Sequence, residues 1–266
     1  MYTTHEIALA FGFTMIAGLS TGIGSLIAFL AKTTNMKFLS TALGLSAGVM
    51  IYVSFMELMP ESVALLSESY SERTATAYML LAFFLGIASI ALIDALVPED
   101  ENPHEIHSAT QASDSKHAGL KRTGIMLALA IGIHNFPEGL AVFTSTLTNM
   151  EIALPIVFAL AIHNIPEGIA VSVPIYHATN NRKKAFVYSF LSGMAEPLGA
   201  LLGFLFLLPF WTPTLNAALL SFVSGIMIYI SFDELLPGTE KYGHHHWGLA
   251  GVVLGMAVMA VSLLLQ

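Results

Sequence analysis

One short motif, His-Asn-x-Pro-Glu-Gly, occurs twice and places ionisable side chains inside apolar stretches of this chain. The copies begin at His134 and His163, within IGIHNFPEGLAV and AIHNIPEGIAV. Residues four apart share one face of an α-helix, so the His and Glu of each copy point the same way and the Asn lies on the flank. Imidazole and carboxylate groups bind Zn²⁺, and also Fe²⁺, Mn²⁺, Co²⁺ or Ni²⁺. The motif therefore predicts a divalent-metal site, with half of it in each copy.

The candidate ligands include a further acid from a third apolar stretch, SGMAEPLGA. The full set is His134, Asn135, Glu138, His163, Asn164, Glu167 and Glu196. A charged carboxylate at the centre of a bilayer costs about 3 kcal/mol on insertion scales, and no Lys or Arg lies between residues 123 and 177 to neutralise it. A bound cation is the simplest compensation. Hydrogen bonding between helices is the alternative, and the doubling of the motif argues against it.

The proline and glycine of each motif have their own effects on the helix. Pro137 and Pro166 have no N–H for the carbonyl four residues earlier, so each frees a backbone oxygen and bends its helix at the site. Gly139 and Gly168 allow neighbouring helices to approach closely.

Composition predicts a membrane protein. The chain has 266 residues, of which 55% are hydrophobic and 11% charged, against about 25% charged in soluble domains. The apolar stretches are long enough to cross a hydrocarbon core of about 30 Å. We expect a single all-α transmembrane domain over 1–266, with eight spans at about 5–31, 38–59, 76–97, 123–146, 151–177, 184–208, 214–236 and 246–265.

The basic residues predict the orientation of these spans. Nine of the ten Lys and Arg residues fall in loops on one side, and only Arg73 falls on the other. The side rich in Lys and Arg is normally cytoplasmic, so both termini are expected outside. A polar, mobile cytoplasmic loop is predicted at about 99–122, carrying His104, His107 and His117.

A second repeat supports a transporter. GVMIYVSFMELMP at 48–60 matches GIMIYISFDELLP at 225–237 with nine identities in thirteen, in spans of opposite direction. The two His-Asn-x-Pro-Glu-Gly copies also lie in antiparallel spans. Inverted repeats around a site at the membrane midplane are typical of secondary transporters. Four further acids, Glu57, Asp94, Asp233 and Glu234, flank the centre as candidate vestibules.

The chain resembles the ZIP family of metal transporters over essentially its whole length, and looks closest to bacterial members. The paired HNFPEG and HNIPEG motifs and SGMAEPLGA carry the resemblance. It implies the ZIP fold, a midplane centre for one or two ions, uptake into the cytosol without ATP, an elevator-like motion and a homodimer in the bacterial inner membrane.

The resemblance also implies a role for each site residue. One metal would take His134, Glu138, His163 and Glu167; the second would take Asn135, Asn164 and Glu196, with Glu138 and Glu167 bridging. Glu57 resembles an entrance residue, and Asp94, Asp233 and Glu234 resemble exit residues.

The sequence thus predicts a divalent-metal importer, zinc-preferring and also admitting Fe²⁺, Mn²⁺, Co²⁺ and Cd²⁺, rather than an enzyme. The metal is the transported substrate and no cofactor is expected. An intramembrane metallohydrolase is the rival from another class, but the chain lacks HExxH; a metal-gated sensor is a second rival. The lipid bilayer is an expected partner, while the net charge of −8 disfavours nucleic acid.

Overall fold

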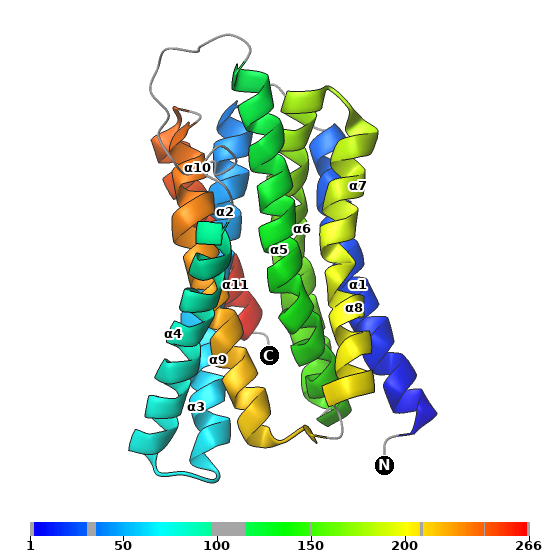
Figure 1. The fold of residues 1–266 in the computed structure, drawn as a ribbon, viewed down its shortest axis with the longest axis vertical. Coiled ribbons are helices and arrows are strands. Elements are labelled where there is room, and N and C mark those ends of the chain that lie inside the picture. The colour runs from blue at the N-terminus through cyan, green and yellow to red at the C-terminus, as the bar shows by residue number, and fades with distance from the viewer. Residues whose placement is uncertain are drawn as a thin grey trace.

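The computed structural model describes residues 3–30, 36–96, 115–148, 150–207, 210–241 and 243–264, and these residues form helices and no strand. The helices run mostly along the long axis, and the two ends of the chain lie toward the same end of the molecule (Figure 1). The helices, with their π-helical turns marked η, are α1 (Thr4–Leu30), α2 (Met36–Val53), η1 (Ser54–Leu58), α3 (Met59–Ser67), α4 (Glu72–Leu96), α5 (Ser115–Thr148), α6 (Met150–Thr179), α7 (Arg182–Gly193), α8 (Ala195–Leu202), η3 (Gly203–Leu207), α9 (Pro213–Ile230), η5 (Ser231–Leu235), α10 (Leu236–Lys241) and α11 (His245–Leu264).

Six helical segments in the described part of the chain are long and apolar enough to cross a membrane. They are Thr4–Ile27, Met36–Ser67, Glu72–Ala95, Arg182–Phe206, Pro213–Glu240 and His245–Leu264. The two other predicted spans fall within α5 and α6, some of whose side chains lie outside the described residues. Most of the predicted loop also lies outside them, but its last part is helical, because α5 begins at Ser115.

Two predicted spans end too early, and π-helical turns explain why. The spans expected to stop at 59 and 236 continue to Ser67 and Lys241, because the chain passes its proline without breaking. In η1 the N–H of Met59 donates to the carbonyl of Ser54, and in η5 that of Leu236 donates to Ser231, five residues earlier. The backbone hydrogen bonds thus change from a spacing of four residues to a spacing of five just before Pro60 and Pro237. Both turns occupy the same place in the inverted repeat, and such bulges are frequent at functional sites.

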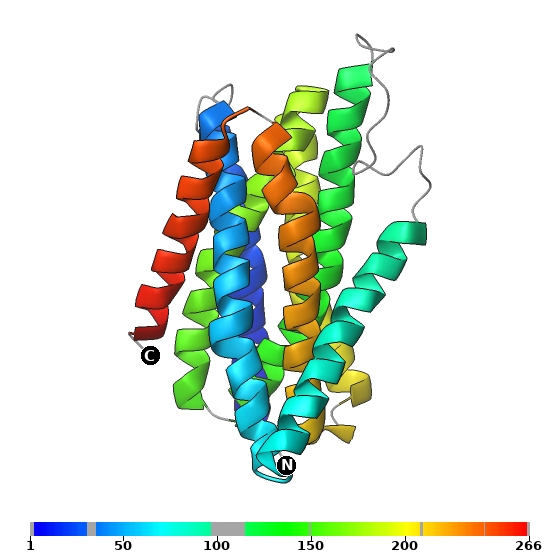
Figure 2. The ribbon, with the colours of Figure 1, turned by 90° about the vertical axis from the view of Figure 1, so that its left-hand side faces the viewer.

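The helices form two bundles. One contains α1, α5, α6, α7 and α8, and the other contains α2, α3, α4, α9 and α11. Figure 2 shows α4 slanting across the outside of the second bundle. Contact between the bundles is made chiefly by α2 against α6 and by α5 against α9. The largest apolar cluster spans this boundary, with Met50, Ile131, Val171 and Met227 buried in it.

Glycines allow helix backbones to touch within each bundle. A Cβ at Gly48 of α2 would collide with the carbonyl group of Val252 on α11, and one at Gly86 of α4 would collide with Phe222 on α9. In the first bundle, a Cβ at Gly24 of α1 would collide with the backbone of α6. This close packing fits the small-residue interfaces of membrane helices.

We expect Gly48→Ala to destabilise the second bundle by about 1–3 kcal/mol, because the new methyl group meets backbone that cannot give way. The apparent melting temperature of the purified protein in detergent should fall by several degrees. Gly12→Ala is the matched control, since nothing lies within 4 Å of a Cβ at that position. Equal melting temperatures for the two variants would contradict this account.

Candidate metal centre

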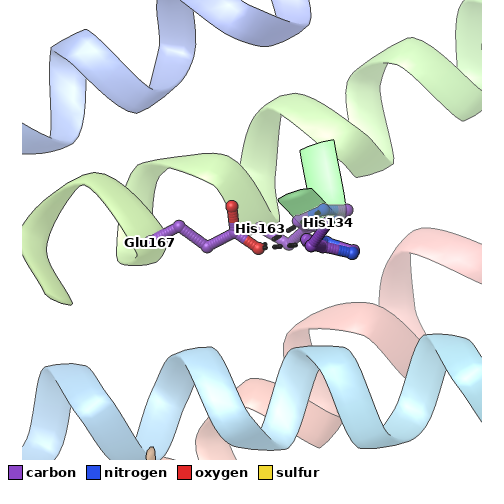
Figure 3. Close-up of side chains that lie close together, drawn as sticks. All are labelled: His134, His163 and Glu167. Carbon is purple, nitrogen blue, oxygen red and sulfur yellow. Dashed lines mark ion pairs between the residues drawn. The ribbon is translucent and has the colours of Figure 1, made fainter. Parts of the chain in front are cut away.

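The two copies of the motif bring four ionisable side chains together. His134 and Glu138 lie one turn apart on α5, and His163 and Glu167 lie one turn apart on α6. Because α5 and α6 pack side by side along much of their length, the two pairs face each other. Figure 3 shows the Glu167 carboxylate pointing toward both imidazoles.

Both glutamates lie between the two histidines. His163 Nε2 is 2.9 Å from Glu138 Oε1, and His134 Nε2 is 3.4 Å from Glu138 Oε2. Glu167 Oε1 is 3.5 Å from His134 Nε2 and 3.9 Å from His163 Nε2. One ligand atom each from His134, His163 and Glu167 lie within 4.8 Å of one another. Each imidazole therefore lies within 3.9 Å of both carboxylates, so four potential ligands converge on one place.

The motif asparagines are oriented by the backbones of neighbouring helices. Asn135 Nδ2 donates to the carbonyl of Ser192 on α7 at 3.2 Å, and Asn164 Nδ2 donates to the carbonyl of Ala17 on α1 at 3.0 Å. These bonds fix which end of each amide carries the nitrogen. The amide oxygens of both residues are left as acceptors.

Glu196 joins the asparagine part of the cluster. It lies at the start of α8, which follows α7 after the single turn residue Met194, and is fully buried. Its Oε1 accepts a hydrogen bond from Asn164 Nδ2. The structure thus brings all seven predicted ligands into one buried region, with Asn164 joining Glu196 to the α6 motif.

Several acceptor oxygens of the cluster have no hydrogen-bond partner. Among the described residues, Asn135 Oδ1, Asn164 Oδ1, Glu196 Oε2 and both Glu167 oxygens accept no hydrogen bond, although all four side chains are fully buried. A buried polar atom left unpaired costs about 1–3 kcal/mol. A cation would satisfy several of these atoms at once, because each offers a lone pair and none offers a proton.

The four flanking acids lie on helices of the second bundle rather than on those that carry the seven ligands. Glu57 is half-buried in η1, and Asp233 and Glu234 are half-buried in η5. The predicted span ends at 59 and 236 placed these three acids near helix ends, but they lie in turns inside longer helices. Asp94 of α4 accepts a hydrogen bond from the Tyr229 hydroxyl at 3.4 Å, which places it near the η5 acids.

The contribution of α1 was missed from the sequence. This helix supplies the carbonyl of Ala17 to Asn164, and Ser189 of α7 also reaches the carbonyls of Gly168 and Thr21. The run GLSTGIGS at 18–25 was the available signal, since small and polar residues in an apolar helix mark a close helix contact.

Of the predicted loop histidines, His104 and His107 lie outside the described residues, as does the His117 side chain.

These features define a class of protein: a helical membrane protein with a buried His, Glu and Asn cluster built from two copies of one motif. Comparison with known proteins identifies the family. The model described as ZIP Zinc transporter matches residues 96–263. The chain therefore belongs to the ZIP family, as the motifs predicted.

Similarity to individual proteins extends over nearly the whole chain. It is 58% identical over 262 residues to the zinc transporter ZupT of Streptococcus mutans, covering 98% of this chain and 99% of that protein. It is 54% identical over 275 residues to ZupT of Nitratidesulfovibrio vulgaris, covering 100% and 99%. These relatives confirm the resemblance to bacterial members of the family. The family is one of transporters, which confirms that this chain was rightly predicted not to be an enzyme.

Removing a ligand should weaken metal binding. We expect Glu167→Gln to lower the affinity of the purified protein for Zn²⁺ at least tenfold, since even the loss of an outer-shell partner costs about 10- to 100-fold. Isothermal titration in detergent measures this. Glu72→Gln, at the exposed start of α4, is the control for loss of a carboxylate. The same affinity in both variants would place the metal elsewhere.

Proposed function

We propose that this protein carries divalent metal cations across the bacterial cytoplasmic membrane into the cytosol. Zinc is the preferred substrate, and Fe²⁺, Mn²⁺, Co²⁺ and Cd²⁺ are further substrates. The observation that carries the proposal is that two imidazoles and two carboxylates, each imidazole within 3.9 Å of both carboxylates, converge where they are buried between apolar helices. Relatives that share more than half of their residues with this chain are named zinc transporters.

The donor set suits a transported ion. Imidazole and carboxylate ligands bind Zn²⁺ and its neighbours well, and the absence of cysteine from the sequence removes the ligand that would hold soft metals most tightly. A carrier has to release its ion, so moderate affinity favours transport. The chain carries no nucleotide-binding motif, and we propose that it runs without ATP.

The ion passes along a path of acidic groups. Metal enters by Glu57, and the His and Glu residues of the two motifs then replace its water ligands. It leaves past the exit acids Asp94, Asp233 and Glu234. Asn135, Asn164 and Glu196 form a second position beside the first, with Glu138 and Glu167 between the two. The hydrogen bond from Asn164 to Glu196 supports this position, because it links the acid of α8 to the motif of α6.

The topology that we propose has eight spans and both termini outside. It adds α5 and α6 to the six membrane-length segments. The two chain ends lie toward one end of the molecule, as an even number of spans requires (Figure 1). We propose a homodimer as the assembly, as the family resemblance implies.

The two bundles support an elevator-like motion. Within the first bundle, Gly139 and Gly199 contact backbone on the facing helix, and Asn135 bonds across to α7. Within the second, Ser40 bonds to the carbonyl of Thr239 and Ser62 to that of Ala217. The boundary between the bundles carries large apolar side chains instead. Such a surface can slide without breaking hydrogen bonds, so the metal centre would move with the first bundle as one body.

Uptake by the reconstituted protein tests the function. Wild-type proteoliposomes should accumulate Zn²⁺ down its gradient without ATP, whereas Glu138→Gln and His163→Ala should lower the rate at least tenfold, because each removes a ligand that contacts both halves of the centre. The control variant His5→Ala, which changes an exposed histidine in the first turn of α1, should transport at the wild-type rate. Wild-type rates in both ligand variants would refute the proposal, and binding without flux would favour a sensor.

A further inference from the structure

The first bundle contains an inverted pair that sequence comparison alone does not show, formed by α1 and the α7–α8 helix. A Cβ at Gly139 of the first motif would collide with the carbonyl of Glu196, and one at Gly168 of the second motif would collide with the carbonyl of Thr21. The variable residue of each motif, between Asn and Pro, contacts a glycine of the facing helix. The backbone of Phe136 lies against Gly199 of α8, and that of Ile165 lies against Gly24 of α1. The spacing from Thr21 to Gly24 equals that from Glu196 to Gly199.

The hydrogen bonds of the asparagines follow the same relation. Asn135 donates to Ser192, four residues before Glu196, and Asn164 donates to Ala17, four residues before Thr21. Gly18 and Gly193 contact each other's carbonyls where the two helices meet. In each of these glycine contacts and asparagine bonds, the position of Thr21 on α1 corresponds to the position of Glu196 on α8.

The Thr21 hydroxyl behaves unlike that of other buried threonines. Thr21 is fully buried, and its Oγ1 has no hydrogen-bond partner among the described residues. By contrast, Thr14 of the same helix donates to the carbonyls of Ala10 and Phe11, as buried helical threonines commonly do. The Thr21 side chain lies against Gly193 on α7, next to Ser192, which holds Asn135. An unpaired hydroxyl therefore lies on the asparagine side of the metal centre.

We propose that Thr21 is the counterpart of Glu196 and supplies a neutral oxygen to a divalent cation on the Asn135 side of the centre. This inference rests on the proposed function, since it names a further contact at the same site. Because threonine is shorter than glutamate, its hydroxyl holds a water molecule of the cation rather than replacing that water. The two halves of the centre then differ by one negative charge, which makes Thr21 a position that affects metal preference.

Thr21→Val tests the proposal, because valine keeps the shape of threonine and removes the hydroxyl. In proteoliposomes we expect the KM for Mn²⁺ to rise about fivefold, the effect of one lost hydrogen bond. The KM for Cd²⁺ should change less, because a softer ion depends less on a neutral oxygen. Thr21→Ser, which keeps the hydroxyl, should restore the wild-type ratio of Mn²⁺ to Cd²⁺ uptake.

Thr14→Val is the matched control, because it removes a hydroxyl that is equally buried but already bonded within its own helix. Melting temperatures of the two valine variants separate a packing defect from an effect on the metal. If wild type transports metal, Glu138→Gln does not, and Thr21→Val matches Thr14→Val in both KM values, the inference about Thr21 is wrong while the proposed function stands. If wild type does not transport, the proposed function itself fails.

Discussion

The cost of burying acceptors in hydrocarbon is the constraint on which the rest of this structure depends. Glu138, Glu167 and Glu196 are removed from water, and the amide hydrogens nearest to them are directed to the carbonyls of Ser192 and Ala17. The amide oxygens of Asn135 and Asn164 therefore stay free as acceptors. Such a region is stable only when something positive enters it. A metal ion meets that need without adding a permanent charge to the protein, and it can leave again.

The surrounding helices supply the rigidity that this arrangement requires. Each motif ends in a glycine that lets a neighbouring backbone approach, so Gly139 fixes α5 against α8 and Gly168 fixes α6 against α1. The same contacts place the Ser192 and Ala17 carbonyls beside the asparagines. One residue type thus sets both the distance between helices and the orientation of the amides. For this reason the ligands and their supports belong to one bundle, and the contacts with the other bundle are left to apolar side chains.

The His and Glu cluster of the candidate metal centre was largely predictable from the sequence because its halves repeat. Two copies of one motif in antiparallel spans leave few ways to arrange His134, Glu138, His163 and Glu167, and the structure brings these four together as expected. The ends of two spans were not predictable, because Pro60 and Pro237 read as helix breakers. A π-helical turn before each proline carries the helix on. The counterpart relation between Thr21 and Glu196 was hidden for a different reason: the two helices share their spacing of small residues and almost none of their side chains, so only the contacts show it.

Departures from symmetry are where the chemistry of this fold lies. The two π-helical turns have the sequences SFMEL and SFDEL, so Glu57 corresponds to Glu234, while Asp233 corresponds to Met56. Asp94 adds a third carboxyl group near the second turn, through its bond with Tyr229. One mouth of the proposed path therefore carries one acid and the other carries three. In the centre, the position on α1 that corresponds to Glu196 is likewise a threonine, Thr21, rather than a second glutamate. A strictly symmetric chain would offer a cation the same environment in both directions. In the transport that we propose, the inverted scaffold supplies the path, and these few substitutions give its two ends and its two central positions different charge to offer a divalent ion.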